Sequence, residues 1–89
     1  MSRNGKRSIT TGVVRGIYRH FKGKDYLVEG LATEAGTEDT LNPVQKVVYR
    51  ALYGEYQLYM RDAEEFFEII DRNDYDNYHG PRFRLVRPL

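Results

Sequence analysis

The stretch at residues 17–32, IYRHFKGKDYLVEGLA, decides the fold of this chain. Two runs of alternating apolar and polar residues meet at the polar link over 22–25. The glycine of this link, Gly23, can adopt a positive φ, which tight connections between antiparallel strands often require. The stretch therefore predicts a β-hairpin with strands over 13–21 and 26–32.

The segments that follow predict further short strands. Alternation over 45–53 and 56–61, with a turn at Gly54 and Glu55, indicates a second hairpin. Asp62, followed three residues later by an acid, has the form of a capping box and favours one short helical turn. A closing strand is expected over 83–86, between two prolines. These elements predict a mainly β protein, a small SH3-like antiparallel barrel of four to six strands.

Size and composition limit what the chain can be. With 89 residues and no cysteine it forms one small domain without disulfides, and with two histidines we predict no metal site and no cofactor. We expect a mobile basic tail over 1–12 and a single β-barrel domain over 13–89. No apolar run reaches the roughly 18 residues of a membrane span, so we expect a cytoplasmic protein that does not bind membranes.

Charge is strongly segregated although the formal net charge is only +1. The first 24 residues hold seven basic groups and no acid, all thirteen acids lie between Asp25 and Asp76, and three arginines follow in the last nine residues. If the two terminal strands are neighbours, their arginines form a basic face that favours anions. The alternative is that these arginines serve solubility alone.

Three blocks of the sequence carry a family resemblance. The first reads GIYRHFKG from Gly16 and continues as YLVEGLA from Tyr26; the second is VVYRALYG from Val47; the third contains Arg61, Phe66 and Glu68. In these blocks the chain resembles the bacterial family of unknown function DUF1653. The resemblance implies a small β-barrel domain and supplies no activity.

Aromatic and basic residues fall at matching phases of the predicted strands. A closed or half-closed sheet could bring several of them to one mouth, where tyrosine faces stack on a planar ligand and cations hold its anionic group. The candidate ligand-binding residues are Tyr18, His20, Lys22, Tyr49, Tyr53, Tyr59 and Arg61. The alternative for each is a core position or a cross-strand pair.

The sequence favours a binding protein over an enzyme, because no nucleophile–base pair or metal cluster stands out. We expect a non-enzymatic module that binds an anionic, nucleotide-like small molecule and sequesters it. One alternative is a protein–protein adaptor or inhibitor that uses the acidic loop over 34–39. Another is a nucleic-acid-binding module that uses the basic termini. Formation of a homo-oligomer through sheet edges is left open.

Overall fold

The computed structural model describes residues 13–72 and 78–89, and the predicted tail over 1–12 lies outside them. It confirms a mainly β chain with one short helix. The elements, in chain order, are β1 (Gly16–His20), β2 (Asp25–Thr33), β3 (Gln45–Ala51), β4 (Leu58–Asp62), α1 (Ala63–Phe66), β5 (Ile69–Arg72), β6 (Tyr78–Pro81) and β7 (Phe83–Pro88).

Five strands form one antiparallel sheet in the order β4-β3-β2-β1-β7, and β5 pairs with β6 in a separate ribbon. Both predicted hairpins are present, as β1–β2 and β3–β4, and the expected pairing of the terminal strands occurs between β1 and β7. The second hairpin is shorter than predicted. Tyr56 has a positive φ of 56°, which breaks the extended backbone, so β4 begins only at Leu58.

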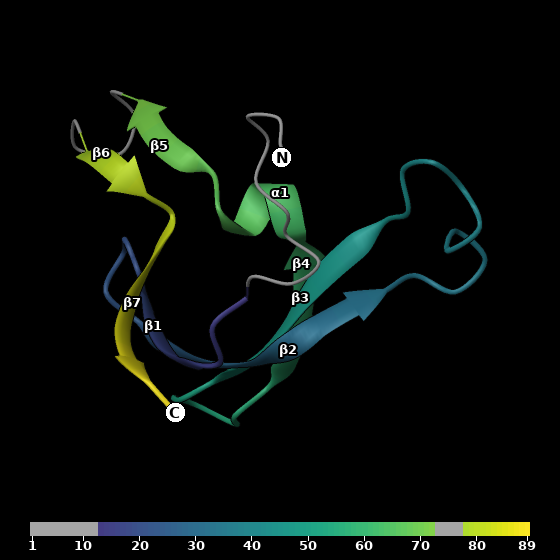
Figure 1. Ribbon diagram of the computed structural model, residues 1–89. Helices are drawn as coiled ribbons and strands as arrows, with labels where there is room; N and C mark the ends of the chain where they lie inside the picture. Colours follow the sequence, from purple (N-terminus) through teal and green to yellow (C-terminus); the bar gives the residue numbers. More distant parts are fainter. Residues whose placement is uncertain (1–12, 73–77) are drawn as a thin grey trace.

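The large sheet is curved, and α1 and the β5–β6 ribbon lie over its concave side (Figure 1). The register shifts near Gly30, where Glu29 is an extra residue in β2, and again where Val86 is an extra residue in β7. Such bulges bend strands and increase their twist. Within the described residues β4 and β7 do not pair, so the sheet is open and the predicted SH3-like closure is not confirmed.

The core fills the space between the concave face and α1. Phe66, on α1, is fully buried and stacks on Phe83 of β7, with ring centroids 4.0 Å apart. Tyr18 and Tyr49 meet the Phe66 ring edge-on from β1 and β3. A helix of four residues has little stability of its own, so this aromatic packing holds α1 on the sheet.

The capping box predicted at the start of α1 is not formed. Among the described residues, the Asp62 side chain makes no hydrogen bond to the helix; its carboxylate instead accepts one from Lys46 Nζ at 2.5 Å. Glu65 likewise binds Arg61 rather than the helix start. Asp62 thus pairs with a cation of the adjacent strand β3, 16 positions away, which the local sequence pattern does not reveal. Glu65 pairs with the arginine four positions before it.

No helix among residues 13–72 and 78–89 is long and apolar enough to cross a membrane.

Gly16 pairs with Pro88, and the backbones of β1 and β7 approach closely at this position. A Cβ added there would lie 2.4 Å from the carbonyl oxygen of Arg87 and 2.7 Å from the Cα of Pro88. Backbone atoms cannot yield as a flexible side chain can, so Gly16→Ala should separate β1 from β7. We expect a loss of about 1–3 kcal/mol in the free energy of unfolding, measured by urea denaturation.

Gly30→Ala is the matched control, because a Cβ at this second strand glycine meets nothing within 4 Å. Its free energy of unfolding should stay within about 0.5 kcal/mol of the unsubstituted protein. Equal destabilisation by both substitutions would contradict the close β1–β7 approach.

Candidate functional site

An aromatic floor covers the end of the concave face where β1 turns into β2. We use this name for the rings of Tyr26, Tyr49 and Phe83, whose centroids lie 5.3 to 5.5 Å from one another. Tyr26 is its centre, since its ring also contacts those of His20, Tyr53 and Tyr59. The floor forms because Tyr26 and Tyr49 occupy concave positions on adjacent strands, and β7 brings Phe83 opposite His20.

Two of the predicted site residues belong largely to the core. Tyr18 and Tyr49 are each only 5% exposed. The Tyr18 hydroxyl donates a hydrogen bond to the carbonyl of Val14 at 2.8 Å, and burial raises its pKa. The Tyr49 hydroxyl accepts a hydrogen bond from Arg61 Nε at 3.3 Å. Tyr18 therefore supports the sheet, whereas Tyr49 positions the guanidinium group of Arg61.

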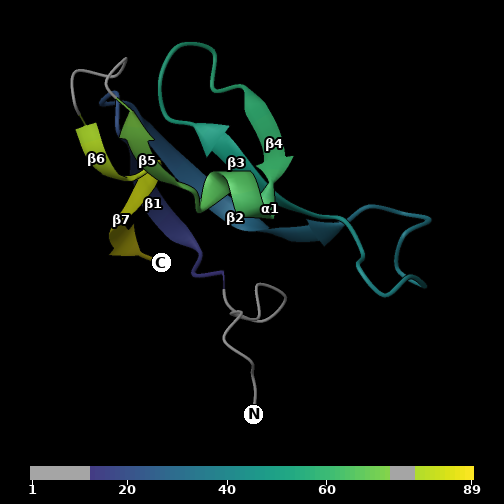
Figure 2. The same ribbon diagram turned by 90° about the horizontal axis from the view of Figure 1, so that it is seen from above.

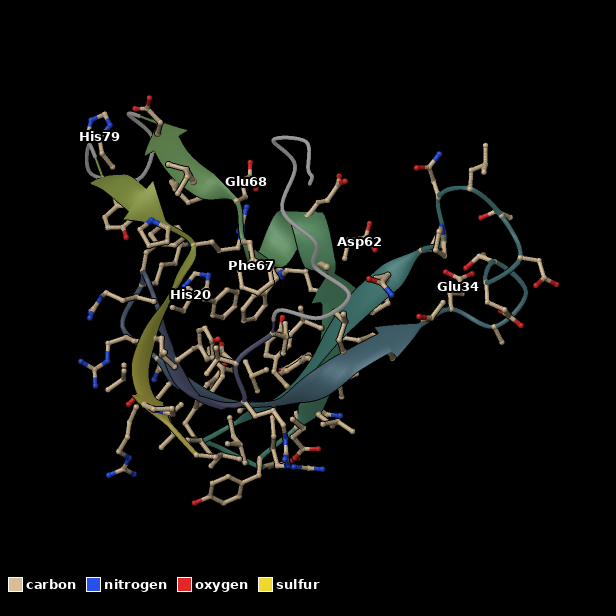
Figure 3. The ribbon with its side chains drawn as sticks, in the orientation of Figure 1. His20, Glu34, Asp62, Phe67, Glu68 and His79 are labelled. Atoms are coloured by element: carbon tan, nitrogen blue, oxygen red, sulfur yellow. The ribbon has the colours of Figure 1, made fainter. Side chains whose placement is uncertain are left out.

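His20 lies inside the curve of the sheet, on the same side as Phe67 (Figure 3). Its Nδ1 accepts a hydrogen bond from the backbone N–H of Lys22 at 3.0 Å, which places the proton of the neutral ring on Nε2. Burial, followed by the positive charges of Arg82, Arg61 and Lys22, lowers its pKa from 6.5 to about 4. At neutral pH, His20 is therefore an uncharged hydrogen-bond donor surrounded by cations.

Arg61 and Arg82, 21 positions apart in the sequence, converge on one acid of α1. Arg61 Nη1 donates to the Glu65 carboxylate at 3.3 Å, and Arg82 Nε donates to the Glu65 carbonyl at 3.2 Å. Arg82 also binds the carboxylate of Glu68 at 2.7 Å. Both positive charges act on His20. We call His20, Arg61 and Arg82 the basic site.

Partly exposed tyrosines border the aromatic floor. The Tyr53 and Tyr26 hydroxyls are 2.6 Å apart, and Lys24 Nζ lies 4.9 Å from the centroid of the Tyr53 ring. Burial and this hydrogen bond raise the pKa of Tyr26. Tyr59, on the edge strand β4, is 43% exposed, with its ring 5.8 Å from that of Tyr49. These rings offer aromatic surface next to the basic site.

The structure thus brings together five predicted residues: His20, Tyr49, Tyr53, Tyr59 and Arg61. Lys22 lies in the β1–β2 turn, near enough for its charge to act on His20. Sequence reasoning missed Tyr26, Glu65 and Arg82 as site residues. Tyr26 shares the phase of the other concave positions and could have been found, whereas Arg82 and Glu65 depend on how β7 and α1 pack.

The lowered pKa of His20 predicts a pH dependence of stability. The unfolded chain binds a proton at this residue near pH 6.5 and the folded chain near pH 4, so the unfolded state holds more protons between these values. The stability that the neutral His20 contributes to the folded state is therefore fully present above pH 6.5 and is lost as the pH falls toward 4. Urea midpoints measured between pH 4 and 7.5 should decline on acidification.

His20→Gln isolates this effect from the titration of carboxylates, because it keeps a polar group and removes the titrating one. The decline between pH 6.5 and 4 should be shallower in the variant. Identical pH profiles for the two proteins would mean that His20 takes up its proton as readily when folded as when unfolded.

A family model described as a protein of unknown function, DUF1653, matches residues 16–85. The chain belongs to the DUF1653 family. The matched range includes the whole basic site and the aromatic floor. A crystal structure of a DUF1653 protein from Bordetella bronchiseptica is similar to this DUF1653 chain, with a TM-score of 0.70 and 29% identity. The similarity covers 90% of this chain and 95% of that one. A search of curated proteins gives no match.

Proposed function

We propose that this DUF1653 protein is a non-enzymatic binding module for an anionic, planar small molecule such as a nucleotide. The observation that carries the proposal is the convergence of Arg61, Arg82 and neutral His20 beside partly exposed tyrosine rings. Arginine is suited to planar anionic groups such as phosphate, and aromatic faces are suited to bases. As part of the same proposal, the protein is cytoplasmic and the curved sheet is an open variant of an SH3-like barrel.

The Glu65 carboxylate marks the position that we assign to the anion of the ligand. It is more than half exposed, and its contact with Arg61 is long at 3.3 Å. An exposed ion pair of this kind contributes about 0–1 kcal/mol, so a multivalent phosphate can displace it at little cost. By contrast, Arg82 is mostly buried and held by Glu68 at 2.7 Å. Arg82 would provide a fixed positive charge, while Arg61 would exchange Glu65 for the ligand.

The test is a set of calorimetric titrations with adenosine monophosphate, inorganic phosphate and adenosine at matched ionic strength. If both the phosphate and the ring are recognised, the nucleotide should bind at least about tenfold more tightly than either part. A single-stranded oligonucleotide serves as a fourth probe, since binding through the basic termini would weaken steeply with added salt. If adenosine monophosphate, inorganic phosphate and adenosine all give no heat of binding, the proposed function is contradicted.

The loop over 34–44 supports a second candidate, the adaptor function. It extends away from the rest of the protein (Figure 1), and Leu41 within it is 97% exposed. Thr37 holds the loop together: its hydroxyl donates to the Glu34 carbonyl and accepts from the Val44 N–H, at 2.8 and 3.0 Å. Binding of a basic partner protein that is lost in Leu41→Ser would support this alternative.

A further inference from the structure

The two edge strands of the large sheet differ in how they are protected against pairing with another strand. Seen from above, β4 forms one margin of the sheet and β7 the opposite one (Figure 2). The β7 edge carries Arg84, Arg87 and Pro88, and charged residues and proline are the usual means of blocking an edge. β7 also exposes Leu85 and Val86, but Arg84 and Arg87 flank them and Val86 is the bulge residue. β4 exposes three consecutive large apolar or aromatic residues, Leu58, Tyr59 and Met60, and its two charged residues come only at its end. Of the two edges formed by the described residues, β4 is the one less protected against pairing with another strand.

The backbone of β4 is oriented for such pairing. The N–H of Ala51 donates to the carbonyl of Gln57 at 2.9 Å, which fixes the phase of the β3–β4 ladder. In this phase Tyr59 and Arg61 direct their backbone groups toward β3. Alternate residues of an antiparallel strand point opposite ways, so the N–H and C=O groups of Leu58 and Met60 point outward.

From these features we infer that β4 is a self-association edge, which pairs antiparallel with β4 of a second copy around a two-fold axis at Tyr59. Charge and apolar matching select this register. It places Leu58 opposite the second copy's Met60 and Arg61 opposite its Gln57. Centring on Arg61 would place two arginines opposite each other, and centring on Met60 would place Leu58 opposite Asp62.

The inference does not depend on the proposed ligand, because it concerns the backbone and outer edge of β4. The pairing would nevertheless join the two concave faces at Tyr59, which borders the aromatic floor in each copy. Five residues of ladder bury less surface than a standard protein interface, so we expect weak association.

Sedimentation equilibrium at protein concentrations from about 10 µM to 1 mM should show the average mass rising from monomer toward dimer. We choose this concentration range because a small interface is expected to associate weakly. Met60→Lys places a charge on the paired edge without touching the core and should weaken association at least about tenfold. Val86→Lys on β7, also an exposed apolar residue, should leave the association unchanged. Circular dichroism spectra of both variants check that they are folded.

Single cysteines test the register, because the chain has none of its own. Across a two-fold axis at Tyr59 the two copies of that residue form a non-hydrogen-bonded pair, with Cα atoms about 4.5 Å apart, which suits a disulfide. Tyr59→Cys should therefore form an intermolecular disulfide under mild oxidation much faster than Met60→Cys, whose two copies are offset. A monomer at every concentration, loss of the dimer in Val86→Lys alone, or faster cross-linking of Met60→Cys would overturn the inference.

Discussion

Replacing Phe66 with alanine should lower the free energy of unfolding by about 3–5 kcal/mol, as observed for large buried aromatic residues. The ring is fully buried and contacts Tyr18, Tyr49 and Phe83. A chain of this size has roughly 5–10 kcal/mol of stability in all, so much of it would be lost. Urea denaturation followed by circular dichroism measures the change.

Phe67→Ala is the matched control for this prediction. Phe67 follows α1 directly and meets Phe66 edge-on at 5.1 Å, but it is only half-buried. We expect about half the loss produced by Phe66→Ala. If Phe66→Ala unfolds at nearly the same urea concentration as the unsubstituted protein, then α1 does not close the core as the packing indicates.

The second large effect concerns phosphate recognition at the basic site. Arg61→Ala should weaken binding of adenosine monophosphate about tenfold to a hundredfold, because a hydrogen bond to a charged group contributes about 1.5–3 kcal/mol. Glu65→Gln should do the opposite and strengthen binding, since it removes the carboxylate that occupies Arg61. Isothermal titration calorimetry of the two variants measures both changes.

Arg50→Ala provides a control of the same residue type. Arg50 forms an ion pair with Glu29 at 3.2 Å on the convex face of β3. The substitution therefore removes the same charge as Arg61→Ala, but from the opposite side of the sheet. It should change the affinity far less than Arg61→Ala. Weaker binding in Glu65→Gln, or equal losses in Arg50→Ala and Arg61→Ala, would show that the anion binds elsewhere.

Local patterns in the sequence predicted β1 to β4 and β7, because alternation and turn residues act over short distances. They did not predict the β5–β6 ribbon, so the described residues form seven strands where four to six were expected. Gly23, with φ of +106°, connects the first hairpin as its position suggests, and Gly16 and Gly30 lie at a close approach and beside a bulge. The barrel closure was not confirmed, because pairing of β4 with β7 depends on the curvature summed over five strands. No local sequence pattern indicates the curvature of the whole sheet.

The division of the tyrosines between core and site is likewise a property of the packed structure. Tyr18, Tyr49 and Tyr59 all lie on concave positions, yet α1 covers the first two and leaves Tyr59 at the open edge. A helix of four residues gives no periodic signal from which this coverage could be read. Arg82 directly precedes β7 and is held by residues distant in the sequence: its backbone N–H donates to the Glu68 carbonyl, and its carbonyl accepts from the Phe21 N–H.

The most direct test of the site is the nitrogen NMR spectrum of the His20 imidazole, recorded in His79→Gln so that a single histidine remains. We predict a neutral ring protonated at Nε2, a pKa of about 4, and a shift of the Nε2 resonance as adenosine monophosphate is added. A ring that titrates near 6.5, carries its neutral-state proton on Nδ1 and does not respond to the nucleotide would contradict the account.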